Sequence, residues 1–285
     1  MRATTREIRE TLTPHYEGRE IEAMMRIIFE RVMGYTRVDM VLHAEDELPD
    51  IVKDKIRGIL ARLVEREPLQ YILGDAYFCG LHFAVDSRVL IPRPETERLV
   101  DMVTSEAKGS DLRVLDIGTG SGCIAISIAR ALHFPIVTAT DISSEALEVA
   151  RQNAGNLRVK IDFKIEDILT ARPPVNPTYD IIVSNPPYVT MSEKSAMDRN
   201  VLDYEPHLAL FVPDEDPLLY YKAIVCYAAK ALKRGGGLYL EINPIYAASV
   251  EGLLAKEDFV SIDTERDFAG KIRFAKARRK RPDQF

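Results

Sequence analysis

The chain has 285 residues and a formal net charge of −6, with 46% hydrophobic and 29% charged side chains. This composition is typical of a globular protein that buries an apolar core. The negative balance argues against nucleic-acid binding by the whole surface, because such binding needs an excess of Lys and Arg. Met1–Glu10 contains no apolar signal segment and no charge-free run reaches about 18 apolar residues, so we expect a cytoplasmic protein without membrane association.

The length is too great for one small core and suggests one large domain or two unequal ones, of which two are expected. The three cysteines, Cys79, Cys123 and Cys226, are far apart and odd in number. They provide neither a disulfide framework nor a CxxC metal knuckle, so no metal site is expected. Each cysteine is instead expected to be a small, buried apolar residue.

Residues 1–73 carry apolar side chains at helical spacing. One segment contains Ile21, Met24, Met25, Ile28 and Val32, and a later one contains Ile51, Ile56, Ile59, Leu60 and Leu63. Spacings of three and four residues place such side chains on one helix face, which predicts a small all-helical domain. Gly34, which follows the first segment, is expected to be a helix C-cap.

Residues 74–94 show a different pattern. Aromatic and β-branched residues surround Gly80 within Ala76–Val85, which is typical of a β-hairpin. Pro92 and Pro94 then prevent a continuing ladder, because proline lacks the N–H that a strand needs. These residues are therefore predicted to form a hairpin connector between two domains.

Residues 95–285 alternate between strand and helix signals. Strands are expected at 113–117, 136–140, in the run ending at Ser184, at 238–242, and around Val260 and Phe274, with helices near 122–132 and 145–154. Gly235–Gly237 is expected to turn the chain before the strand at 238–242. Such alternation predicts an α/β domain whose parallel sheet is covered by helices on both faces.

A glycine-rich turn, Gly118-Thr119-Gly120-Ser121-Gly122, follows the first of these strands and precedes a helix. Glycines let the backbone approach a ligand closely, and free N–H groups at a helix start can donate to it. The same pattern is also compatible with a simple tight turn. Its GxGxG spacing departs from the GxGxxG of nicotinamide cofactor sites.

Asp141 ends the next strand, about 20 residues after the glycines, where such sheets hold a ribose through a carboxylate. The alternative is that Asp141 only caps the helix beginning near Ser143. Together the glycines and Asp141 point to a cofactor that carries adenosine. They do not choose between NAD and S-adenosylmethionine.

Asn185-Pro186-Pro187-Tyr188 follows the strand that ends at Ser184. The Asn185 side-chain oxygen and the Pro186 carbonyl can accept the two N–H groups of an amide or exocyclic amine, and the prolines donate no N–H. These two hydrogen bonds would orient a weakly nucleophilic, planar nitrogen, and the flat Tyr188 ring would pack against the planar amide or base. The motif favours N-methylation over hydride transfer, although it is also compatible with a turn that merely ends a strand.

Longer motifs accompany these residues. They are Tyr71–Gly74, Phe78–Phe83, Val89–Glu97, the Gly118–Gly122 turn and Asn185–Tyr188. With them the chain resembles the bacterial release-factor glutamine methyltransferases of the HemK/PrmC type over nearly its whole length. The resemblance implies a class I (Rossmann-like) methyltransferase domain with a seven-stranded sheet, preceded by a helical substrate-binding domain and a β-hairpin.

The resemblance also implies the reaction. S-Adenosylmethionine is the expected methyl donor and S-adenosylhomocysteine the product. The expected substrate is side-chain N5 of the glutamine in the Gly-Gly-Gln loop of class I peptide chain release factors, whose methylation modulates translation termination. Release factors are the expected partners of a monomer without stable nucleic-acid binding.

Site residues are carried over from the resemblance by position. The expected cofactor-binding residues are Gly118, Thr119, Gly120, Ser121, Gly122, Asp141, Ile168 and Asn185, and the expected catalytic and substrate-binding residues are Asn185, Pro186, Pro187 and Tyr188. Ile168 stands where the family often has an aromatic residue beside adenine, and it is equally compatible with a place in the core. Asn243-Pro244 departs from the family, which more often has a glycine there.

Two alternatives to release-factor methylation stay open at this stage. The same chemistry would serve a glutamine of a ribosomal protein or the exocyclic amine of a nucleobase in DNA or RNA. A non-catalytic binding module could also retain the fold. The acidic chain disfavours DNA, which requires a positive groove.

Overall fold

The computed structural model describes residues 1–281, which form two compact units. The first contains Met1–Gly74 together with Asp198–Tyr204, and the second contains the rest. The short segment Asp198–Tyr204 lies far from the other residues of its unit in the sequence. Within residues 1–281, no helix combines the length and apolar character needed to cross a bilayer.

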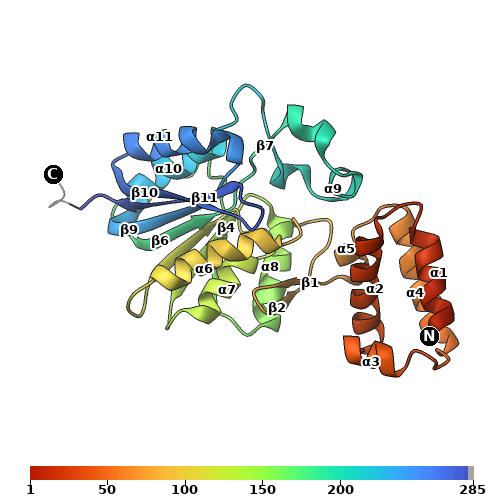
Figure 1. Cartoon of the computed structure of the whole chain (residues 1–285). Helices are drawn as coiled ribbons and strands as arrows, with labels where there is room; N and C mark the ends of the chain where they lie inside the picture. The colour runs from red at the N-terminus through yellow and green to blue at the C-terminus, as the bar shows by residue number, and fades with distance from the viewer. Residues whose placement is uncertain (282–285) are drawn as a thin grey trace. The chain divides into compact units, whose positions relative to one another are not determined.

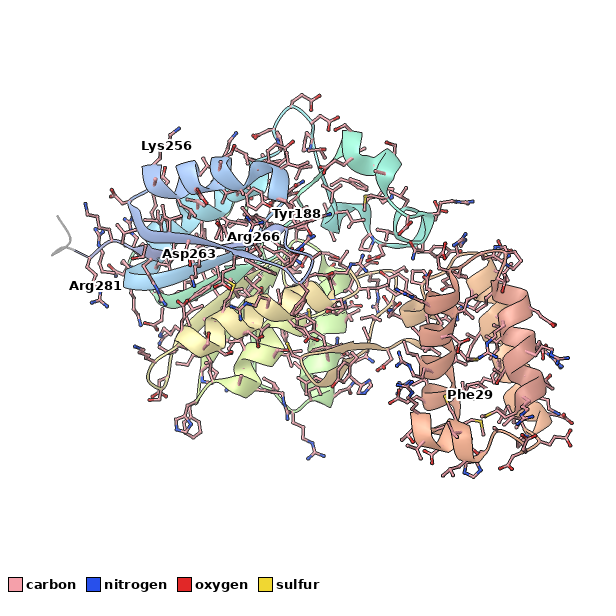
Figure 2. All side chains as sticks on the ribbon, viewed as in Figure 1. Phe29, Tyr188, Lys256, Asp263, Arg266 and Arg281 are labelled. Carbon is pink, nitrogen blue, oxygen red and sulfur yellow. The ribbon has the colours of Figure 1, made fainter. Side chains whose placement is uncertain are left out.

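The first unit is entirely helical (Figure 1). Its helices are α1 (Arg2–Leu12), α2 (Gly18–Met33), α3 (Arg37–Leu42), α4 (Asp50–Val64), α5 (Leu69–Leu73) and α9 (Arg199–Tyr204). Phe29 is fully buried among them (Figure 2). Gly34 has a φ of +71° and donates its N–H to the Glu30 carbonyl, which confirms the expected C-cap. Ile51 shares the apolar spacing but lies in the first turn of α4 and is 79% exposed.

The second unit begins with the predicted hairpin, in which β1 (Ala76–Phe78) pairs antiparallel with β2 (Leu81–Phe83). A seven-stranded sheet follows, built from β3 (Arg113–Ile117), β4 (Ile136–Asp141), β5 (Asp162–Ile165), β6 (Tyr179–Ser184), β9 (Leu232–Glu241), β10 (Phe259–Arg266) and β11 (Ile272–Arg279). Its order is β10-β11-β9-β6-β3-β4-β5, with β11 antiparallel to both of its neighbours and the other pairs parallel. The predicted fold class is confirmed.

Helices cover both faces of this sheet (Figure 1). On one face lie α6 (Glu97–Glu106), α7 (Cys123–Ala131) and α8 (Ser144–Asn156), and on the other lie α10 (Leu219–Ala231) and α11 (Ala247–Lys256). Each face buries its own apolar cluster against the strands. A smaller sheet pairs β7 (Val189–Thr190) with β8 (Phe211–Val212).

The glycine run Gly235–Gly237 does not form the predicted turn before a strand, because it belongs to β9 itself. The register between β6 and β9 shifts between Tyr179 and Ile181, so β9 has extra residues there that form a bulge. A Cβ on Gly236 would lie 3.0 Å from the carbonyl oxygen of Asp180. The glycines therefore permit a close backbone approach inside the strand.

The expectation for the cysteines is only partly correct. Cys123 is buried, Cys79 is half-buried and Cys226 is exposed. Cys226 lies on α10 four residues from Lys222 and four from Lys230, and both lysines are exposed. That spacing places all three on the solvent face of the helix, which the composition of the chain alone does not reveal.

Asn153 of α8 is 1% exposed and anchors the segment that follows the hairpin. Its Nδ2 donates to the carbonyl of Ala84 at 3.0 Å and to that of Ser121 at 2.9 Å. Its Oδ1 accepts from the Ala84 N–H at 2.7 Å. One amide thus satisfies three backbone groups from two loops.

We expect Asn153→Ala to lower the free energy of unfolding by about 2–4 kcal/mol, because buried backbone groups would lose their partners. Urea unfolding measures the change. Asn156→Ala, at the exposed end of the same helix, is the matched control and should cost less than about 0.5 kcal/mol. Equal stabilities of the two variants would contradict the anchoring role.

Candidate functional site

A cavity of about 540 Å³ lies at the carboxyl ends of β3, β4 and β6. This is the edge at which open α/β sheets bind their ligands. Seven predicted site residues line it: Gly118, Gly120, Asp141, Ile168, Asn185, Pro186 and Pro187. The other predicted residues, Thr119, Ser121, Gly122 and Tyr188, all belong to the described chain and do not line it.

The glycine-rich turn owes its shape to left-handed backbone conformations. Gly118, Gly120 and Gly122 have φ values of +72°, +55° and +81°. A Cβ on Gly122 would also lie 3.1 Å from Ile126 Cδ1 and 3.2 Å from Ala150 Cβ. Gly118 and Gly120 have open space around them, so at these positions the backbone angle rather than crowding favours glycine.

Asp141 connects the turn to the next strand. Its Oδ2 accepts from the Gly120 N–H at 2.8 Å, and its Oδ1 accepts from the Ser143 N–H at 2.9 Å. The N-cap of α8 is Ser143, whose hydroxyl accepts from the Ala146 N–H, so Asp141 is not the capping residue. Burial raises the pKa of Asp141 and the two N–H groups oppose that shift. Each oxygen keeps a second lone pair that can face the cavity.

Asp116 lies fully buried beneath the turn. Its Oδ2 accepts from the Thr119 hydroxyl at 2.6 Å, and its Oδ1 has no hydrogen-bond partner within residues 1–281. Burial raises the pKa of Asp116 from its ordinary value of 3.8 to about 7, although the bond from Thr119 lowers it. Sequence reasoning did not assign a role to this carboxyl group.

Asn185–Tyr188 leaves the sheet at the end of β6. The Ser184 hydroxyl donates to the Ile117 carbonyl at 2.7 Å and fixes the ends of β6 and β3 together. Asn185 Nδ2 donates to Thr96 Oγ1 at 3.3 Å. Pro186 and Pro187 line the cavity without donating an N–H.

Tyr188 contacts the interior instead of the cavity. Its hydroxyl donates to Glu241 Oε1 at 3.0 Å and accepts from Arg273 Nη1 at 3.3 Å. Burial raises the pKa of Tyr188, and the Glu241 charge raises it further. The expected packing of the Tyr188 ring against a planar amide or base stays a prediction.

Asn243, where the sequence departs from the family, is hydrogen-bonded to the backbone of the motif Asn185–Tyr188. It is 3% exposed, and its Nδ2 donates to the Tyr188 carbonyl at 3.1 Å and to Glu193 Oε2 at 3.1 Å. Its Oδ1 accepts from the Ile245 N–H at 3.0 Å. The amide side chain therefore holds the backbone of the motif in place.

Sequence reasoning missed several residues that line the cavity. They include Ser87–Leu90, Leu208, Tyr220 and Ile224. The connector and the loop after α9 are joined here, because buried Glu205 accepts from the Ile91 N–H at 3.1 Å and from the Arg93 guanidinium. Of these residues, Val89 and Leu90 belong to the motif Val89–Glu97, whereas Tyr220 and Ile224 have the spacing of ordinary residues of α10.

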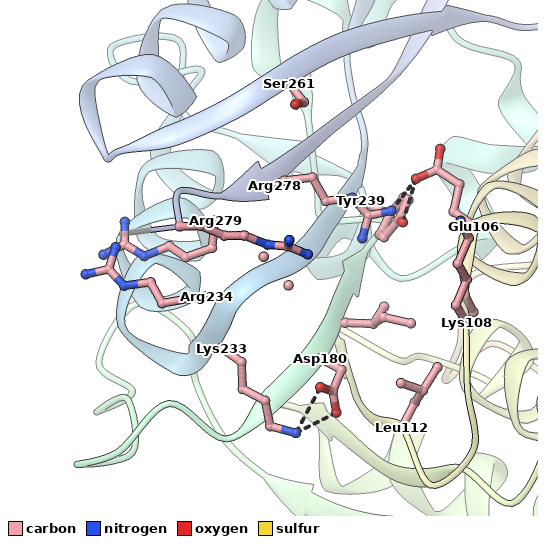
Figure 3. A pocket seen from close by; sticks show the side chains of 15 residues that line it. Glu106, Lys108, Leu112, Asp180, Lys233, Arg234, Tyr239, Ser261, Arg278 and Arg279 are labelled. Carbon is pink, nitrogen blue, oxygen red and sulfur yellow. Dashed lines mark hydrogen bonds and ion pairs between the residues drawn. The ribbon is translucent and has the colours of Figure 1, made fainter. Parts of the chain in front are cut away.

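A second cavity of about 490 Å³ lies near the amino-terminal ends of β6 and β9 (Figure 3). In it Lys233 Nζ donates to Asp180 at 2.8 Å, and Glu106 accepts from Tyr239 and Arg278. Both carboxylates already have partners within the protein. Because ligands of α/β sheets bind at the opposite edge, the first cavity is the better candidate.

Two family models match the chain. One described as methyltransferase small domain matches residues 94–204, and one described as PrmC N-terminal domain matches residues 4–74. A release factor glutamine methyltransferase of Bacteroides thetaiotaomicron is 42% identical, over 98% of this chain and 100% of its own. One of Flavobacterium psychrophilum is 43% identical, over 94% and 95%.

Solved structures support the fold. A methyltransferase from Pyrococcus furiosus covers 78% of this chain and 98% of its own, with a TM-score of 0.52 and 18% sequence identity. At this identity the likeness concerns the fold alone.

The raised pKa of Asp116 predicts a pH-dependent stability. The folded protein holds this proton more tightly than the unfolded chain, so stability falls as pH rises from about 4 to about 7. Between about pH 5 and pH 7.5 we expect wild type to lose on the order of 2 kcal/mol more than Asp116→Asn, which does not ionise. Urea unfolding of both proteins at the two pH values measures this, and parallel losses would contradict it.

Proposed function

Because the chain belongs to the release factor glutamine methyltransferase family, we propose that it transfers a methyl group from S-adenosylmethionine to glutamine N5 in the Gly-Gly-Gln loop of class I peptide chain release factors. The observation that carries the proposal is that the glycine turn, Asp141 and Asn185 line a single cavity. This activity would modulate translation termination, and we expect it in the cytoplasm, where translation occurs.

The residues around the cavity fit the cofactor. A volume of about 540 Å³ lies within the range of small-molecule sites. The free lone pairs of Asp141 suit two ribose hydroxyls, and the left-handed glycines let the backbone approach closely. Ile168 and Tyr220 provide apolar and aromatic surface for a base. S-Adenosylmethionine supplies an electrophilic methyl group on its sulfonium sulfur.

Asn185 and Pro186 would orient the substrate. An amide nitrogen is a weak nucleophile because its lone pair is delocalised into the carbonyl group. Asn185 Oδ1 and the Pro186 carbonyl can accept its two N–H groups, and neither proline offers a competing donor. Fixed orientation of this kind can contribute on the order of 7 kcal/mol or more.

The proposal is tested with labelled S-adenosylmethionine and a purified release factor, followed by mapping of the modified residue. Wild type should label the glutamine of the Gly-Gly-Gln loop. Asn185→Ala should lower kcat by roughly 100-fold or more, because the nitrogen loses its acceptor, while the cofactor dissociation constant stays nearly unchanged.

Asp141→Ala is the reciprocal control. It removes the proposed ribose acceptor and should weaken cofactor binding instead. Label on a nucleic acid or a ribosomal protein, with none on the release factor, would overturn the substrate assignment. Equal turnover by Asn185→Ala and wild type would remove Asn185 from the mechanism.

We further propose that residues 1–73 bind the protein substrate. A groove of about 660 Å³ within the helical unit is lined by six arginines and one glutamate. The arginines are Arg2, Arg6, Arg9, Arg19, Arg26 and Arg37. Met25, Met40 and Val41 add apolar surface, and Val41 is 74% exposed. Positive charge around an apolar floor favours an acidic, partly apolar segment of the partner.

Reversing charge in this groove should weaken substrate binding. We expect Arg6→Glu combined with Arg26→Glu to raise KM for the release factor by about tenfold, with an unchanged cofactor dissociation constant. Lys55→Glu, exposed on α4 and outside the groove, is the control and should behave as wild type. An unchanged KM in the double variant would exclude the groove as the docking surface.

A further inference from the structure

A chain of buried side chains lies behind Asn185. Asn185 Nδ2 is 3.3 Å from Thr96 Oγ1, which is 2.6 Å from Glu241 Oε2. Glu241 Oε1 is 3.0 Å from the Tyr188 hydroxyl, which is 3.3 Å from Arg273 Nη1. Thr96 and Glu241 are 2% and 1% exposed, so water does not compete for the bond between them.

With Glu241 ionised, the chemistry of these groups sets the direction of every bond. The Arg273 guanidinium only donates, so the Tyr188 oxygen accepts from it and the Tyr188 proton points to Glu241. Burial raises the pKa of Glu241, whereas the bonds from Thr96 and Tyr188 and the charge of Arg273 oppose that shift and favour the ionised form. As an ionised carboxylate Glu241 only accepts, so the Thr96 hydroxyl also donates to it. Because the Thr96 hydroxyl donates its one proton to Glu241, the Thr96 oxygen can only accept a hydrogen bond from Asn185.

From this geometry we propose that Thr96 and Glu241 are positioning residues that set the orientation of the Asn185 amide. The NH₂ group faces Thr96, and Oδ1 is left to accept an N–H of the substrate. This inference rests on the proposed function, because only an N–H-bearing substrate requires an acceptor there. The reversed amide would present a donor to a donor, and the substrate nitrogen would lose its alignment.

The two residues come from distant parts of the chain. Thr96 ends a short 3₁₀ turn, Pro94–Thr96, just before α6, and Glu241 ends β9. Burying a carboxylate costs free energy unless its lone pairs are satisfied. Glu241 receives two hydroxyl donors, and one of them, Thr96, is the residue that contacts Asn185.

The test compares Thr96→Val with Thr96→Ser. Valine retains the shape of threonine and loses the hydroxyl, whereas serine retains the hydroxyl and loses the methyl. We expect Thr96→Val to lower kcat on the release factor by about 10- to 100-fold with little change in the cofactor dissociation constant, and Thr96→Ser to retain activity within about threefold. A packing role would give the opposite order.

Glu241→Gln provides a second variant. Its amide must offer NH₂ to one of the two hydroxyls, so we expect a reduced kcat with cofactor binding preserved. Thr104→Val is the matched control, because the Thr104 hydroxyl donates to the Val100 and Asp101 carbonyls of its own helix α6. It should keep the kcat of wild type.

A readout that needs no substrate separates this inference from the proposed function. In ¹⁵N-labelled protein, the Asn185 side-chain amide, assigned by its loss in Asn185→Ala, should exchange with deuterium faster in Thr96→Val than in wild type or Thr96→Ser. Identical exchange in all three proteins, or equal kcat in both Thr96 variants, would overturn the inference. An inactive wild type would contradict only the proposed function.

Discussion

The parallel register of β3, β4 and β6 is the constraint on which the site depends. Ile117 pairs with Thr140 on one side and with Ser184 on the other, so all three strands end at the same level of the sheet. The glycine turn follows β3, Asn185 follows β6, and Asp141 is the last residue of β4. Backbone hydrogen bonds, rather than contacts among the site residues, therefore bring them to one cavity.

Much of this arrangement was predictable, because the signals are local. Each signal lies within a few residues: GxGxG after one strand, Asp141 at the end of the next, and Asn185-Pro186 after a third. Parallel pairing of these strands then places the three signals at one edge of the sheet. The chain of bonds through Thr96 and Glu241 was not predictable. It joins residues that are far apart in sequence, and a buried carboxylate has no pattern of its own.

The basic residues near the end of the sequence illustrate the same limit. Read as a string, they suggest a patch that could bind polyanions. In the folded protein Arg273 pairs with Asp267, Lys276 pairs with Glu106 and Glu265, and Arg278 pairs with Glu106. These three basic side chains of β11 are therefore paired with carboxylates of α6, of β10 and of the turn after β10.

Asn153 gives the glycine turn and the hairpin a shared anchor, since it binds the carbonyl of Ser121 and both backbone groups of Ala84. A ligand that restrains the turn consequently restrains the residues after the hairpin. Coupling of this kind is reciprocal: the factor by which a bound ligand favours the ordered residues after the hairpin is also the factor by which their ordering raises ligand affinity. We therefore expect the connector to contribute to the rigidity of the cavity.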